Sequence, residues 1–208
     1  EAKKDLNKVP KPINSVIPKS TIIEPFVFID ENVKVGNNCI IKSGAKIFSN
    51  VIIGDNSIIG PNSVIGYEGF GIDRDGENSF KDIPIKGKGK KMKHYGRVII
   101  GSGSDIGALN TIAKGVIGPT VLGKNILTSD NVHISHNCVI EENVAIAGSV
   151  LVSGSAKIGK NSWIGPNSTI LQKVKVGKKN IIGISTTIFI DTPDNTKWLG
   201  NPAKRISF

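Results

Sequence analysis

Aromatic residues and cysteines are both scarce in this sequence. Phe, Trp and Tyr make up 5% of its 208 residues, so a core must be built from aliphatic side chains. The two cysteines, Cys39 and Cys138, argue against a disulfide scaffold and favour a reducing, cytoplasmic location. No apolar run approaches the ~18 residues of a membrane span, and no signal peptide is recognisable. We therefore expect no membrane span.

Acidic residues are also in the minority. The chain has 17 Asp and Glu against 27 Lys and Arg, which gives a net charge of +10. Such a charge predicts an anionic partner, either nucleic acid or the phosphates of a cofactor or lipid. No nucleic-acid-binding motif accompanies the charge, so we expect no nucleic-acid partner.

What the sequence does have is a period of six residues. β-Branched residues recur every sixth position from Ile17 to Ile65 and again near Ile100, and an almost wholly aliphatic row runs from Leu122 to Ile188. A helix favours a period of 3.6 and a strand a period of 2. A period of six instead predicts short strands joined by tight turns, with three units closing a triangular coil of 18 residues.

Such coils must stack, because one coil cannot bury its aliphatic row alone. We count seven to eight coils in an all-β domain at residues 17–190. The repeat stops at residues 66–95, which predicts one long, Lys-rich inserted loop of the kind that is often functional. Residues 1–16 form an N-terminal extension and residues 191–208 a C-terminal tail, and we expect both to cover open strand edges. Both cysteines fall at the small inward position of the unit, which predicts two buried thiols.

The repeat unit resembles that of the hexapeptide acyltransferases. It reads Ile53-Gly-Asp-Asn-Ser-Ile58 in one coil and Ile164-Gly-Pro-Asn-Ser-Thr169 in another, and the resemblance covers about residues 17–206. It implies a left-handed parallel β-helix. It also implies acyl transfer from a thioester to an amino or hydroxyl group of a bacterial cell-surface sugar or nucleotide sugar. Family members are homotrimers with active sites between subunits, and we expect the same here.

Two parts of the chain resemble different branches of this family. The middle resembles the lipid A UDP-acylglucosamine N-acyltransferases, which use acyl carrier protein. The end instead resembles acetyl-CoA-dependent sugar acetyltransferases, so we expect acetyl-CoA or another acyl-CoA as co-substrate, an acyl carrier protein thioester as the alternative, and no metal. The segments that carry the two resemblances are Gly69-Phe-Gly71, Gly96-Arg-Val-Ile-Ile-Gly101, Gly118-Pro-Thr-Val-Leu-Gly123, Ile134-Ser-His-Asn137, Ala145-Ile-Ala-Gly148 and, at the end, Gly200-Asn-Pro-Ala-Lys204-Arg-Ile206.

The resemblance assigns a catalytic role to His136 as general base, a role that suits imidazole because its ordinary pKa of ~6.5 lies near working pH. The 18-residue coil predicts that Gly154 stacks on His136, where the family uses a glycine whose N–H can meet the oxyanion. Many relatives orient the histidine with a neighbouring carboxylate. Here Asn137 follows instead, so we expect Ser129 or Asn131 to orient the ring.

The remaining candidates are expected around this pair. Lys173 stands where the lipid A enzyme has a second histidine, and His133 and Phe70 fall where an acceptor pocket is expected. Plain surface roles remain open for all of them. The expected substrate-binding residues are His133, Asn131, Lys173 and Phe70, and the expected cofactor-binding residues are Gly154, Lys178, Lys179 and Lys204.

Two other readings deserve a test. Zinc enzymes similar to the γ-class carbonic anhydrases share this fold, and the chain has three histidines, His94, His133 and His136. His94 and His133 are 39 residues apart and His133 and His136 only 3 apart, whereas that class separates its last two histidines by more. A non-enzymatic solenoid such as an ice-binding protein would need a flat repeated Thr-x-Thr face, and the sequence has none.

Overall fold

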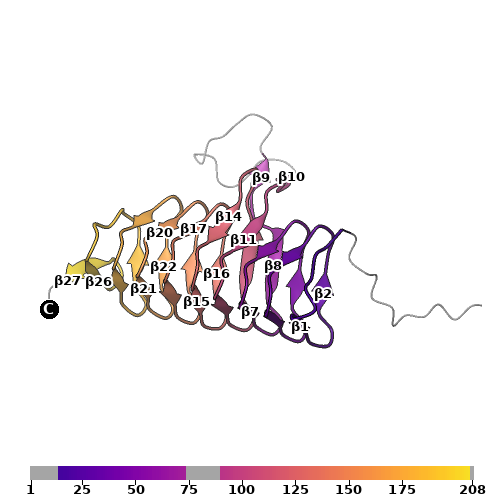
Figure 1. Cartoon of the computed structure of the whole chain (residues 1–208). Helices are drawn as coiled ribbons and strands as arrows, with labels where there is room; N and C mark the ends of the chain where they lie inside the picture. The colour runs from indigo at the N-terminus through magenta and orange to yellow at the C-terminus, as the bar shows by residue number, and fades with distance from the viewer. Residues whose placement is uncertain (1–13, 74–89, 207–208) are drawn as a thin grey trace, which may run out of the picture.

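The computed structural model describes residues 14–73 and 90–206, and every regular element within them is a β-strand. No helix in these residues is long and apolar enough to cross a membrane. The strands lie side by side along one prism, with the first coils at one end and the last coils at the other (Figure 1). The predicted all-β parallel β-helix is therefore confirmed.

The strands are short because the chain turns a corner about every six residues. Most have two residues, an outward one and then a buried aliphatic one, as in Lys157–Ile158. Each coil pairs in parallel with the next, so that Ile140 lies beside Ile158. The six-residue period therefore sets both the corner positions and the strand register. Cys39 and Cys138 are fully buried and unpaired, as predicted.

Three parallel sheets, named A, B and C here, form the faces of the prism. Sheet A contains β3 (Lys34–Val35), β6 (Ile52–Ile53), β11 (Val98–Ile100), β14 (Thr120–Leu122), β17 (Val139–Ile140), β20 (Lys157–Ile158) and β23 (Lys175–Val176). Sheet B contains β1 (Ile22–Ile23), β4 (Ile40–Ile41), β7 (Ile58–Ile59), β12 (Asp105–Ile106), β15 (Leu127–Thr128), β18 (Ala145–Ile146), β21 (Trp163–Ile164), β24 (Ile181–Ile182), β26 (Lys197–Leu199) and β27 (Lys204–Ile206). Sheet C contains β2 (Phe28–Ile29), β5 (Lys46–Ile47), β8 (Val64–Glu68), β13 (Thr111–Lys114), β16 (His133–Ile134), β19 (Leu151–Val152), β22 (Thr169–Ile170) and β25 (Thr187–Ile188).

The prism is longer than the sequence predicts. Sheet B has parallel strands from β1 to β26 in about nine coils, against a prediction of seven to eight. The difference lies in the segment expected as a tail, because β26 pairs in parallel with β24 although no aliphatic hexapeptide leads to it. β27 then runs antiparallel to β26 and ends the parallel stacking. At the other end Val16 bridges to Lys34, and residues 1–13 lie outside the described part of the chain.

The regular period is broken twice, on either side of β13. β8 and β13 are longer than their neighbours, and their pairing shifts register after Ile112. β8 leads to β9 (Ile72–Asp73), which pairs antiparallel with β10 (Lys90–Lys91), and this hairpin projects from the prism (Figure 1). Of the predicted loop, residues 74–89 lie outside the described residues. The strands before and after this point pair residues 22 apart, as Thr111 with His133, whereas later strands pair residues 18 apart, as Val139 with Lys157. The coil that contains the end of β13 therefore has four extra residues.

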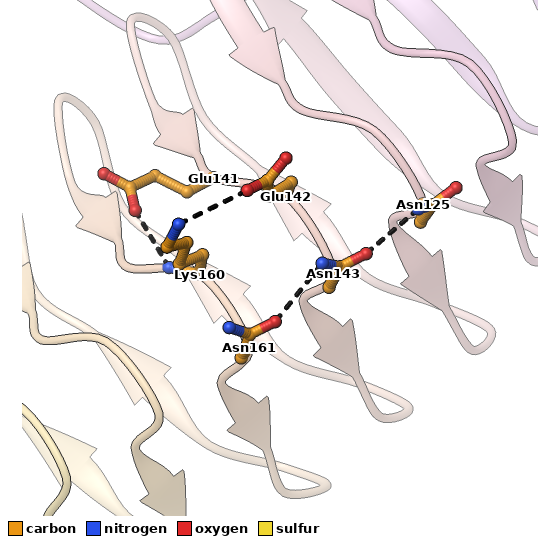
Figure 2. Close-up of polar contacts among 6 residues, drawn as sticks. All are labelled: Asn125, Glu141, Glu142, Asn143, Lys160 and Asn161. Carbon is orange, nitrogen blue, oxygen red and sulfur yellow. Dashed lines mark hydrogen bonds and ion pairs between the residues drawn. The ribbon is translucent and has the colours of Figure 1, made fainter.

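Most corners contain a residue in the left-handed conformation, and it is often asparagine. Asn125, Asn143 and Asn161 have φ values of 56°, 58° and 60°. Asparagine adopts this region more readily than other residues with a side chain. Asn125 Nδ2 donates to Asn143 Oδ1 at 3.0 Å, and Asn143 Nδ2 donates to Asn161 Oδ1 at 3.2 Å (Figure 2). This asparagine ladder ties three successive coils along the edge between sheets A and B.

Candidate active site

His136 lies in the turn between β16 and β17, at the edge where sheet C meets sheet A. The inward positions on either side are filled by the buried Ile134 and Cys138, so the turn residue faces outward. The side chain of His136 is half-buried. The fold therefore holds an imidazole at the surface of a rigid edge.

Asn137 orients the His136 ring. Its Oδ1 lies 3.1 Å from His136 Nδ1 and also accepts a hydrogen bond from the Val116 amide at 2.9 Å. Its amide N–H donates to Thr120 Oγ1, and its Nδ2 donates to the Gly118 carbonyl. The expectation that Ser129 or Asn131 orients the ring is wrong, because the described residues place only Asn137 in hydrogen-bond contact with the imidazole.

These contacts also determine which ring nitrogen of His136 carries the proton. The Val116 N–H identifies Oδ1 as the oxygen of the Asn137 amide, since a nitrogen there could not accept it. An amide oxygen only accepts, so Nδ1 must donate to it. In the neutral ring the proton therefore sits on Nδ1, and Nε2 keeps a lone pair that can accept a proton.

The four extra residues after β13 form the wall that fixes Asn137. Backbone bonds join this segment to residues 95 and 96, with Tyr95 N–H donating to the Val116 carbonyl and Gly96 N–H to the Gly115 carbonyl. A Cβ atom on Gly96 or Gly115 would collide with the Gly118 carbonyl oxygen. Glycine is needed at both positions because the backbones approach so closely.

Gly154 lies directly against the His136 ring, at the position that the 18-residue coil predicts. A Cβ atom at residue 154 would come within 2.7 Å of His136 Cε1 and Nε2. The φ of Gly154 is not in the left-handed region, so space rather than conformation calls for glycine here. Any side chain at this position would displace the imidazole.

The Gly154 amide has no hydrogen-bond acceptor within the described residues. At other coils the amide at the same turn position donates to a carboxylate. Asn37 N–H donates to Asp55, Ala108 N–H to Asp130 and Lys178 N–H to Asp194, at 2.6–2.8 Å. This turn position therefore presents its N–H to an anionic oxygen in three other coils, whereas the amide of the buried Gly154, next to His136, has no such partner among the described residues.

A second histidine meets the His136 ring from the other side. His94 follows the β9–β10 hairpin, and its ring lies edge-on to that of His136 with centroids 5.4 Å apart. Gly69 separates the two, since a Cβ atom there would lie 3.0 Å from His94 Nε2 and 3.3 Å from His136 Cδ2. The sequence reasoning missed this pair. The register of the hairpin, which pairs Asp73 with Lys90, would have placed Gly69 opposite His94.

The other predicted residues are spread over the prism. Lys173 is exposed on the same edge as His136, and its amide donates to the Gly154 carbonyl. His133 lies on the outer face of sheet C, where its Nε2 contacts Ser135 Oγ at 3.0 Å and burial lowers its pKa. Phe70 is exposed beside Gly69. Away from this edge lie Asn131 between sheets B and C, Lys178 and Lys179 between sheets A and B, and Lys204 in β27.

The three histidines do not form a metal-binding triad. His94 and His136 are neighbours, but the His133 ring contacts Ser135 instead. Among the described residues no group of three or more His, Cys, Asp or Glu side chains could hold a metal ion. The described residues therefore do not bring together the three histidines that a zinc site of this kind would need.

The comparisons with known proteins bear on the repeat and on the fold. The model of the bacterial transferase hexapeptide, six repeats, matches residues 14–49 and 155–188. No curated protein sequence is similar enough to count as a match. Similar solved structures are UDP-N-acetylglucosamine acyltransferases from Campylobacter jejuni, Bacteroides fragilis and Francisella novicida.

These structures match nearly the whole chain. The Campylobacter enzyme is 26% identical with a TM-score of 0.73, and the match covers 93% of this chain and 73% of that one. The Bacteroides enzyme is 26% identical with a TM-score of 0.75, and the match covers 92% of this chain and 72% of that one. The Francisella enzyme is 25% identical with a TM-score of 0.75, and the match covers 93% of this chain and 68% of that one. The resemblance to hexapeptide-repeat proteins and the left-handed parallel β-helix are thus confirmed.

Proposed function

We propose that this chain, which shares the repeat and fold of the hexapeptide transferases, moves an acyl group from a thioester to a hydroxyl or amino group of a nucleotide sugar. The observation that carries the proposal is the packing of the His136 ring against Gly154, with a free ring nitrogen next to a free amide. A base and an oxyanion donor side by side are what acyl transfer requires.

His136 would act as the general base. Its Nε2 removes the proton of the acceptor hydroxyl or amine while the acceptor oxygen or nitrogen forms a bond to the thioester carbon. Asn137 accepts the Nδ1–H, so in the neutral ring Nε2 carries the lone pair that receives this proton. A base positioned in this way typically contributes ~10²–10⁴ in rate.

Gly154 would stabilise the intermediate. Its amide N–H donates to the oxyanion that forms on the thioester carbonyl oxygen, in the way that amides at the same turn position of other coils bind carboxylate oxygens. The intermediate then collapses, the C–S bond breaks, and the departing thiolate takes the proton from the His136 imidazolium. The base is thereby restored without any other reactant.

We assign acetyl-CoA as the donor, with longer acyl-CoA thioesters as variants. The motif from Gly200 to Lys204, which resembles that of acetyltransferases, supports a CoA donor. Lys173 lies on the same edge as Gly154, where a cation can meet the phosphates of CoA. Lys178 and Lys179 lie on another edge, so they would reach CoA only along a different face.

A second candidate donor is a thioester on acyl carrier protein, as in the lipid A N-acyltransferases. The three similar structures are enzymes that act on UDP-N-acetylglucosamine, and they support a UDP-sugar as the acceptor. We place the acceptor between His133, Phe70 and His136. Asn131, on another edge, would reach an acceptor only from a neighbouring subunit.

The proposal includes a homotrimer with active sites between subunits. Apolar residues are exposed in the outer row of sheet B, where Leu127, Trp163 and Ile181 are 54%, 41% and 43% exposed. A row of this kind favours association with a second copy of the chain. Light scattering of the purified protein measures the mass, and Trp163→Lys should lower it to that of a monomer.

The direct test is His136→Ala. Turnover with acetyl-CoA and UDP-N-acetylglucosamine should fall at least a hundredfold, the effect of a lost general base, on the order of 10²–10⁴. Thermal stability should stay near that of the wild type, because the side chain is only half-buried. Glu142→Ala is a matched control, since it changes the same turn position on the next edge and should retain activity.

The donor is settled by comparing acetyl-CoA with an acyl carrier protein thioester on the wild-type protein. Faster transfer from the carrier protein would replace the first donor by the second. Near-full activity in the His136→Ala variant would remove His136 from the mechanism with either donor.

A further inference from the structure

His94 is a buried residue with one unused ring nitrogen. Its side chain is 2% exposed, and its Nδ1 lies 3.1 Å from the Met92 carbonyl oxygen. A carbonyl only accepts, so Nδ1 carries the proton and Nε2 keeps the lone pair. Among the described residues, His94 Nε2 is the one buried side-chain nitrogen or oxygen without a hydrogen-bond partner.

The unused nitrogen faces the candidate active site. A side chain at residue 69 would meet His94 Nε2 at 3.0 Å and the His136 Cδ2 and Cβ atoms at 3.3 and 3.4 Å. Gly69 is buried and has no side chain, so both rings pack closely against its backbone. Its φ is not in the left-handed region, and the glycine is therefore explained by this close packing.

The surroundings favour the neutral form of the His94 ring. Burial lowers its pKa, and the hydrogen bond to Met92 opposes this only in part. The charges of His136 and Lys114 lower the pKa further, whereas Glu68 raises it. A neutral Nε2 can only accept a hydrogen bond, and a buried acceptor without a partner is costly. Such a group calls for a donor from a bound molecule.

We propose that His94 Nε2 accepts a hydrogen bond from the sugar acceptor, from an O–H or N–H group next to the one that is acylated. The inference rests on the proposed function and deepens it. His94 binds and positions the acceptor and takes no proton from it. The site then selects acceptors that carry a donor group beside the acylated position, because an acceptor without it would leave Nε2 buried and unpaired.

Three variants separate this role from a structural one. His94→Phe keeps a ring without nitrogen, His94→Gln keeps an acceptor oxygen, and Tyr95→Phe changes the exposed neighbouring ring as a control. With UDP-N-acetylglucosamine as the probe, His94→Phe should raise KM about tenfold, the effect of one lost neutral hydrogen bond, with kcat changed much less. His94→Gln should recover most of the loss, and Tyr95→Phe should behave as the wild type.

Stability gives an independent readout. His94→Phe should leave Tm within about 2 °C of the wild type, because removal of the unpaired Nε2 offsets the loss of the Nδ1–H bond to the Met92 carbonyl. A structural role predicts a clearly lower Tm with KM unchanged. That result would overturn the proposal.

Nitrogen NMR of histidine-labelled protein tests the contact directly. In the His136→Ala variant, which should not turn over, the His94 Nε2 resonance should move upfield when UDP-N-acetylglucosamine is added. A resonance that stays in place while other signals report binding would overturn the proposal. Failure of the proposed function looks different, because the wild-type protein would then transfer no acyl group from any thioester while this titration still reports on His94.

Discussion

The coils from β14 to β25 and the irregular segments around β13 are built by opposite rules. In the regular coils each residue meets its counterpart 18 positions away, as Asn125, Asn143 and Asn161 do in the asparagine ladder (Figure 2). In the irregular part, at residues 66–73, 92–97 and 113–119, contacts depend on glycines that admit a neighbouring backbone or ring. His136 stands where the two parts meet. The difference teaches that the repeat holds His136 against Gly154, whereas the irregular segments orient and enclose the imidazole.

The largest expected effect comes from a side chain placed between the two parts. Gly154→Ala puts a Cβ atom 2.7 Å from the His136 ring, and kcat should fall about a hundredfold, as expected for a displacement on the order of 1 Å. Gly148→Ala is the matched control at the same turn position, because its Cβ atom would find its nearest neighbour at 3.4 Å. Steady-state kinetics of both variants give the comparison. Equal activity in the two would mean that the contact with His136 has no role.

The next largest effect distinguishes two asparagines that have the same backbone conformation. Asn137 and Asn143 both have φ near 60°, so alanine at either position should cost about 1–2 kcal/mol of unfolding free energy. Only Asn137→Ala also frees the His136 ring, and its kcat should fall about tenfold or more. Denaturant unfolding and kinetics of both variants test this. Similar kinetic losses in the two would deny Asn137 its orienting role.

Acid should affect the histidines of this region in a defined direction. Burial lowers the pKa of His94 and His133, so the unfolded chain binds their protons more readily than the folded one. The stability linked to them is complete above the unfolded pKa of about 6.5 and is lost as pH falls through the lower folded pKa. Tm of the wild type should therefore drop on acidification below about pH 6.5, and less so in His94→Gln. An unchanged pH profile in that variant would argue against a neutral buried His94.

The smallest effect belongs to the surface of the regular coils. Lys160 Nζ lies 3.5 Å from Glu142 Oε1, and both side chains are nearly half exposed (Figure 2). Lys160→Ala should change the unfolding free energy by less than about 0.5 kcal/mol, since exposed ion pairs contribute little. The Lys160 amide keeps its bond to Glu141 in that variant. Urea denaturation measures the difference, and a loss of several kcal/mol would contradict this view of the coil surface.

The sequence predicted the features that follow from the six-residue repeat, and few of the features of the segments that interrupt this repeat. The buried rows, the parallel register and the stacking of Gly154 on His136 all follow from repeats of 6 and 18 residues. The orienting role of Asn137 was missed, because it depends on the extra residues after β13 folding back over one turn. The approach of His94 was missed as well, since a hairpin register carries no periodic signal. β26 extends the stack without an aliphatic hexapeptide, so the coils were undercounted.

The extra four residues between β13 and β14 leave the later coils unchanged, because the stacking is carried by backbone bonds and the added length is taken up at one corner. This corner is therefore the natural place for diversification and for engineering. Loops of other lengths grafted between Ala113 and Thr120 would reshape the wall beside the imidazole while the remaining architecture persists. The surroundings of His136 and the integrity of the scaffold can thus be altered separately in this molecule.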